Sequence, residues 1–160
     1  MITASQLAEA FSRNLWVIQT QTEGLTHEDS LRQLPFRGNC LNWVLGHVAQ
    51  YRDQILTGLN AEPVMGEADE RYRRESDPIT DDGAGVLRLE ELLGILERSQ
   101  VALAKALGCA TEEYLREEVQ AGARRVPRGE RLFFFYFHET YHVGQTELLR
   151  QLAGKDDKVI

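Results

Sequence analysis

Apolar residues recur at helical spacing in four separate stretches of the chain, roughly residues 5–22, 41–59, 84–107 and 129–153. An α-helix turns once in about 3.6 residues, so apolar positions three and four apart form one stripe that can pack against a neighbour. The stripe of the first stretch consists of Leu7, Phe11, Leu15 and Ile18. No stretch alternates between apolar and polar residues for long enough to indicate a strand. The pattern predicts an all-α protein, a four-helix bundle.

Boundary residues agree with these predicted helices. Asn39 precedes the second one, where an asparagine side chain can accept a hydrogen bond from a free backbone N–H. Gly58, Gly108 and Gly154 lie near the ends of the second, third and fourth helices, a common position for glycine.

Two long connections interrupt the helical pattern. Residues 60–83 are mostly polar and include Pro63 and Pro78, and residues 109–128 contain room for a short helical turn at 111–118. A structureless connection beyond about 12–15 residues is uncommon unless it crosses a bundle or covers a site. We therefore expect long crossover connections within one domain, residues 1–160, a length that suits a single core.

The charge of the chain argues against nucleic acid as a partner. The formal net charge is −7, whereas a protein that binds nucleic acid without sequence preference needs a basic face. The basic cluster Arg124, Arg125, Arg128 and Arg131 is interpreted as a solvated loop and helix start.

Signals of membrane and secreted proteins are not found in the sequence. The longest apolar run, residues 132–137, is far shorter than the roughly 20 residues of a membrane span. The first dozen residues lack the pattern of a signal peptide. Cys40 and Cys109 are too few for a disulfide framework, and Cys40 is expected to be an inert buried thiol. We expect a cytoplasmic protein with no membrane partner.

Polar residues interrupt the predicted inward face of the last helix. That face consists of Phe134, His138, Tyr141, Gln145, Leu148 and Leu152. A buried polar group without a partner costs about 1–3 kcal/mol, so these groups need partners. His138 and His142 are four residues apart, which places both imidazoles on one side of a helix, about 5–6 Å apart at Cβ. Two such rings can bind one divalent metal.

A third histidine, His47, lies on the flank of the core stripe of the second helix and can also point inward. Imidazole suits Zn, Ni, Fe and Cu, and three neutral histidines leave positions open for water or for a thiol, whose pKa a metal lowers. Taken singly, a histidine such as His47 is more often a hydrogen-bonded core residue. His27 lies in a polar stretch that is typical of a solvated helix start, and we do not include it among the ligands.

Residues 138–142 also match the H-E-x-x-H pattern of zinc peptidases, in which the glutamate is the general base. The extended peptidase pattern fails, because Gln145 and Leu149 occupy two of its required positions. A peptidase also needs an edge strand for its substrate, and none is predicted. Glu139 is therefore expected to be a residue of the second coordination shell or of the surface.

The chain resembles the DinB-like family of four-helix metalloenzymes. The resemblance rests on Asn42-Trp43-Val44-Leu45-Gly46-His47 and His138-Glu139-Thr140-Tyr141-His142-Val143-Gly144-Gln145, together with Asp77-Pro78-Ile79. It implies a metal site at one end of a central cavity with His47, His138 and His142 as ligands. It also implies activity with low-molecular-weight thiols, as S-transferase or isomerase, and a homodimer formed through helix faces. The family name refers to induction by DNA damage, hence to a stress response.

The leading hypothesis is a metal-dependent enzyme that adds or transfers a low-molecular-weight thiol to an electrophilic small molecule, with Zn, Ni or Fe as the metal. Gln145 can orient a ligand, and Tyr51 can donate a hydrogen bond into the cavity, although core packing explains both residues as well. Trp43 and Tyr141 are expected to pack beside the site. Arg71, Arg73 and Arg74 in the first long connection form either an anion-binding lid or a solvated run, and we favour the solvated run.

Three alternatives stay open at this point. The first is a metal-dependent hydrolase that uses metal-bound hydroxide. The second is a non-catalytic stress-response protein that binds a metal or a ligand. In the third, the histidines only stabilise the fold.

Overall fold

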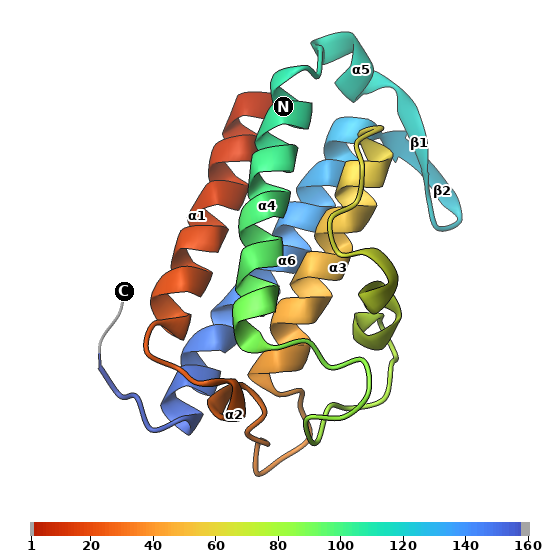
Figure 1. Cartoon of the computed structure of the whole chain (residues 1–160). Coiled ribbons are helices and arrows are strands. Elements are labelled where there is room, and N and C mark those ends of the chain that lie inside the picture. Colours follow the sequence, from red (N-terminus) through yellow and green to blue (C-terminus); the bar gives the residue numbers. More distant parts are fainter. Residues whose placement is uncertain (1, 158–160) are drawn as a thin grey trace.

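Four long helices packed side by side make up most of the computed structural model, which describes residues 2–157 (Figure 1). They are α1 (Ala4–Thr22), α3 (Leu41–Gly58), α4 (Leu89–Gly108) and α6 (Arg128–Leu152). Helix α1 packs against α4 and α6, and α3 packs against the same two helices. The predicted all-α bundle is confirmed.

The direction of the helices explains the first long connection. Helices α3 and α4 run the same way along the bundle, so the chain must return along its whole length between them (Figure 1). This crossover contains the short 3₁₀ helix η1 (Gly66–Tyr72). The first part of the crossover is held against α3 by Asp53. The carboxylate of Asp53 accepts hydrogen bonds from the backbone N–H groups of Val64 at 2.7 Å and Met65 at 2.8 Å.

The crossover is fastened to α3 a second time at Tyr72, which is fully buried. Its hydroxyl donates to Asn42 Oδ1 at 3.0 Å and accepts from the backbone N–H of Leu87 at 2.8 Å. Its ring lies directly on Gly46, where a Cβ would be only 2.0 Å from the nearest ring carbon. A glycine is therefore required at position 46 for the crossover to approach α3 this closely.

The core consists of two apolar clusters, one toward each end of the bundle. In α1, for example, Leu7 and Phe11 belong to one cluster and Leu15 and Ile18 to the other, as their predicted stripe requires. Buried polar side chains from α3, α4 and α6 lie between the clusters in the order of each helix: Arg52, Ser99 and Glu139.

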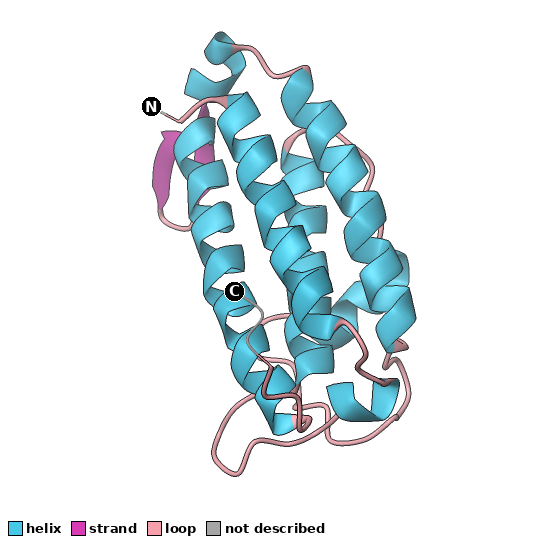
Figure 2. Cartoon of the chain, turned by 90° about the vertical axis from the view of Figure 1, so that its left-hand side faces the viewer, coloured by secondary structure: helices cyan, strands magenta, loops and turns pink. Residues whose placement is uncertain are grey.

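Three predicted helix and strand features were wrong. Cys40, not Asn39, is the N-cap of α3, and it makes no side-chain capping bond. Helix α4 begins at Leu89 rather than at residue 84, because residues 84–88 complete the crossover. The second connection contains the predicted helical turn, α5 (Glu112–Arg116), but also an antiparallel hairpin, β1 (Glu118–Ala121) and β2 (Arg124–Pro127), beside one end of the bundle (Figure 2).

His27 begins helix α2 (His27–Ser30) and is buried, which corrects the expectation of a solvated residue. The backbone N–H of Leu89 donates to its Nδ1 at 3.2 Å, and its Nε2 lies 3.1 Å from Asp82 Oδ1. The imidazole thus supports the first turn of α4.

The predicted inward face of α6 was also wrong: the face that is buried is displaced by about one residue around the helix from the predicted one. Phe134, Tyr141 and Leu148 are 49%, 63% and 47% exposed. The buried face consists instead of Leu132, Phe135, Glu139, Val143, Thr146 and Leu149. Aromatic residues occupy both sides of α6, so spacing alone does not identify the side that packs. None of the described helices has both the length and the apolar character needed to cross a membrane.

Candidate metal centre

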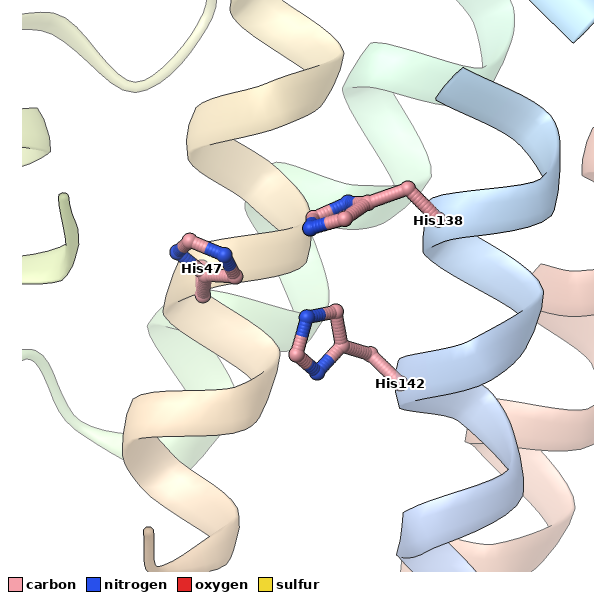
Figure 3. Close-up of side chains that lie close together, drawn as sticks. All are labelled: His47, His138 and His142. Carbon is pink, nitrogen blue, oxygen red and sulfur yellow. The ribbon is translucent and has the colours of Figure 1, made fainter. Parts of the chain in front are cut away.

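His47 of α3 and His138 and His142 of α6 point toward one another across the space between their helices (Figure 3). One ligand nitrogen from each ring lies within 4.8 Å of the other two. The ring centroids are 5.3 Å apart for His47 and His138, 4.9 Å for His47 and His142, and 4.6 Å for the two histidines of α6. This cluster is close enough for one ion to contact all three rings.

The orientation of His47 is set by the crossover. Its Nδ1 lies 2.8 Å from the backbone carbonyl oxygen of Tyr72. A carbonyl can only accept, so Nδ1 carries the proton and Nε2 keeps its lone pair. The ring also stacks on Trp43, with centroids 4.4 Å apart, and the Trp43 indole N–H donates to Ser76 Oγ at 2.9 Å. Residues of the crossover thus fix both the rotation and the tautomer of His47.

The two histidines of α6 have different surroundings. His142 Nδ1 lies 2.9 Å from Gln145 Oε1, which can accept its proton and so leave Nε2 free. His138 stacks on Tyr51 with centroids 4.0 Å apart, and its Nδ1 is buried with no hydrogen-bond partner in the described part of the chain. A buried nitrogen without a partner, on a ring that lies beside two other imidazoles, fits a site that holds an additional atom.

All three imidazoles favour the neutral form that a metal ligand needs. Burial lowers the pKa of His47 to about 4, although its bond to Tyr72 opposes the shift. Burial also lowers the pKa of His138 to about 4, and the neighbouring histidines and Arg74 add to the effect. Burial lowers the pKa of His142 as well, opposed by the bond to Gln145. At neutral pH the cluster therefore offers lone pairs, not positive charges.

Glu139 faces away from the histidines, toward the middle of the core. Its two carboxylate oxygens lie 2.9 and 2.8 Å from Arg52 Nε and Nη2, and the side chains of both residues are buried. The general-base position of a zinc peptidase is therefore not filled by this glutamate. The expectation that Glu139 belongs to the second shell or the surface was wrong.

The donors present fit a divalent transition metal: they are three neutral imidazoles, one of which, His138, has a buried nitrogen without a partner in the described part of the chain. No carboxylate or thiol belongs to the cluster among the described residues. Cys40 is buried elsewhere, where desolvation raises the pKa of its thiol and makes it unreactive.

The model of the DinB superfamily matches residues 9–146. The chain belongs to the DinB superfamily. Its fold is also similar to two solved structures, each 20% identical in sequence. One is a conserved protein from Enterococcus faecalis, with a TM-score of 0.74 and coverage of 97% of this chain and 100% of that one. The other is a DinB-like protein from Bacillus cereus, with a TM-score of 0.69 and coverage of 97% and 96%.

No curated protein matches this DinB-superfamily chain. At these identities the two solved structures support the fold alone, so the chemistry has to be argued from the site. Sequence reasoning missed two contributors to it: the Tyr72 carbonyl, because a backbone group leaves no signal in the sequence, and the Arg52 partner of Glu139, which is 87 residues away.

Proposed function

We propose that this DinB-superfamily protein is a divalent-metal-dependent enzyme that joins a low-molecular-weight thiol to an electrophilic small molecule. The observation that carries the proposal is the cluster of three neutral histidines without a carboxylate among the described residues. A divalent ion held there keeps its full charge and its open positions, and it lowers the pKa of a bound thiol toward neutral.

The residues around the cluster suit a thiolate. Trp43 and Tyr51 provide apolar ring faces next to His47 and His138. The positive charge of Arg74 makes a small contribution at His47 and His138 and favours an anion there only weakly, because its side chain is 78% exposed and lies 3.6 Å from Glu75 Oε1. Gln145 lies within hydrogen-bond distance of His142, which supports a positioning role for it, and the contact of the Tyr51 ring with His47 supports a role in orienting bound reactants.

The reaction is balanced as a nucleophilic substitution or addition. The sulfur lone pair forms a bond to the electrophilic carbon. In a substitution, the leaving group departs with the electron pair of its bond to that carbon. In an addition, the electrons of the π bond move to the neighbouring atom, which takes up a proton from solvent. The thiol proton passes to solvent, because no carboxylate base belongs to the cluster among the described residues.

Turnover assays test the proposal against the hydrolase. Metal-loaded protein is incubated with a chromogenic electrophile, such as 1-chloro-2,4-dinitrobenzene, with and without 2-mercaptoethanol or cysteine. The expected product is the thioether, formed only with thiol and lost in His142→Ala. Cys109→Ser is the matched control, since Cys109 is exposed and distant from the cluster in sequence and is expected to leave turnover unchanged. Hydrolysis without thiol would support the hydrolase, and metal binding without turnover on any electrophile tested would support a binding protein.

We further propose that the protein forms a homodimer through the outer face of α6. This face carries exposed apolar side chains: Phe133, Phe134, Phe137, Tyr141 and Leu148. Contiguous exposed apolar residues of this kind commonly mark an interface. Light scattering should give a dimer for the wild type and a monomer for Phe137→Glu, whereas Val101→Glu, at an exposed position of α4, should stay dimeric. A monomeric wild type would contradict this proposal.

A further inference from the structure

The boundary between the two core clusters contains a buried ion pair. Arg52 of α3 is fully buried and Glu139 of α6 is 2% exposed. Arg52 Nε donates to Glu139 Oε2 at 2.9 Å and Nη2 donates to Oε1 at 2.8 Å. Two parallel bonds of this kind fix the direction as well as the distance between the two side chains.

The remaining donors of Arg52 reach the other two long helices. Nη1 donates to the Leu96 carbonyl at 3.0 Å and to Ser99 Oγ at 3.2 Å, both on α4. Nη2 also donates to the Phe11 carbonyl on α1 at 3.2 Å. A guanidinium has five N–H donors, and these bonds account for all five. One side chain therefore joins all four helices of the bundle.

The ion pair connects the two helices that carry the histidine cluster, at the level of the cluster. Arg52 directly follows Tyr51, whose ring stacks on His138. Glu139 directly follows His138 on the other helix, and its buried carboxylate accepts from Arg52 in the core. A slide or rotation of α6 against α3 that moved His138 away from His47 would thus also break the bonds between Arg52 and Glu139.

Apolar packing alone does not prevent such a slide or rotation of α6 against α3. Burial of apolar surface is not directional, and cores tolerate repacking when their volume is kept. Buried ion pairs add little to stability compared with apolar residues of similar size, because the charges lose their hydration. A geometric role explains the pair better than a stabilising one.

We infer that Arg52 and Glu139 are positioning residues, which hold α3 and α6 in the register at which His47 meets His138 and His142. The inference rests on the proposed metal site, since it assigns the pair a function in assembling that site. It also gives the glutamate of the H-E-x-x-H pattern a role other than general base.

The double variant Arg52→Met/Glu139→Leu tests whether the ion pair sets the register of α3 and α6 or only contributes to the stability of the protein. The two helix carbonyls that Arg52 contacts also accept from their own helices, and Ser99 Oγ still donates to the Leu96 carbonyl, so the apolar pair leaves no acceptor unpaired. Cobalt(II) is titrated into the metal-free protein, and its visible absorption spectrum gives both the Kd and the ligand geometry. Thermal unfolding of the same samples is followed by circular dichroism.

The double variant should unfold within a few degrees of the wild type yet bind cobalt at least about tenfold more weakly, with an altered spectrum, because the three imidazoles are no longer held at the geometry that the metal requires. Leu103→Ala is the matched control: it removes a buried side chain from the cluster around Phe11 and Phe135 and should lower the stability without changing the Kd or the spectrum. Glu139→Asp keeps the charge on a shorter side chain and should weaken binding less than the double variant. This variant decides the question if the double variant does not fold.

A wild-type Kd and spectrum in the double variant, or in Glu139→Asp if the double variant does not fold, would overturn the positioning role and leave the metal site intact. Equal weakening in Leu103→Ala would assign the effect to lost stability and would also overturn it. Failure of the wild type to bind cobalt would refute the metal site itself, and the positioning role with it.

Discussion

Replacing Gly46 by alanine is expected to destabilise the protein, although alanine is the better helix former. The new Cβ would lie 2.0, 2.3 and 2.4 Å from three ring carbons of Tyr72, far inside van der Waals contact. The ring cannot easily yield, because Tyr72 is fully buried and its hydroxyl is bonded to Asn42 and Leu87.

The magnitude follows from three opposing contributions. Alanine in place of glycine favours a helix by about 1 kcal/mol. Overpacking costs about 1–3 kcal/mol, and the loss of the two hydrogen bonds of Tyr72 costs about 1 kcal/mol each. The free energy of unfolding should therefore fall by about 2–4 kcal/mol, which for a chain of this size lowers Tm by roughly 4–16 °C.

Thermal and urea unfolding, followed by circular dichroism, measure this change. Gly144→Ala is the matched control on α6, between His142 and Gln145, where a Cβ would meet nothing within 4 Å. It should leave the protein as stable as the wild type or raise its stability by up to about 1 kcal/mol. Gly46→Ala should also weaken metal binding, because the displaced Tyr72 carbonyl no longer orients His47. A Gly46→Ala protein as stable as the wild type would refute the close packing of the crossover on α3.

Two further predictions concern charge at the cluster. Metal-free protein should lose stability as the pH falls from 7.5 to 5, since unfolded histidines take up protons near pH 6.5 while His47 and His138, with pKa values of about 4, stay neutral in the folded protein. Urea midpoints measure this loss, and a slope no smaller in His138→Gln than in the wild type would contradict its assignment to the cluster. Arg74→Gln should weaken binding of 3-mercaptopropionate to cobalt-loaded protein about two- to fivefold, and should weaken binding of 2-mercaptoethanol less, because its bound thiolate carries one negative charge instead of two. Arg13→Gln, the same charge change on an exposed arginine of α1, should alter neither thiol, and an equal effect there would assign the change to net charge.

Local spacing was enough to predict the parts of the fold that depend on neighbours in the sequence. The buried stripe of α1 and the shared side of His138 and His142 follow from the helical repeat alone. The approach of His47 to that pair depends on how α3 packs against α6. Spacing indicated only that His47 can point inward from the flank of its helix stripe, and the family resemblance implied the three histidines as one ligand set.

The features that escaped prediction depend on contacts between distant residues. Arg52 and Glu139 look like surface residues by their charge, and only their pairing makes burial possible. His27 is buried because it packs against residues more than 50 positions away: the backbone N–H of Leu89 donates to its Nδ1, and Asp82 lies beside its Nε2. The hairpin escaped because each strand has only four residues, too few to show alternation.

Metal content measured on untagged protein tests the central claim most directly. Elemental mass spectrometry is applied to the wild type and to His138→Ala, each as purified and after incubation with zinc, nickel and iron followed by desalting. The account predicts about one equivalent of a transition metal in the wild type and its loss in the variant. Wild-type protein without metal after all three incubations, or His138→Ala with an undiminished content, would contradict a metal centre built from His47, His138 and His142.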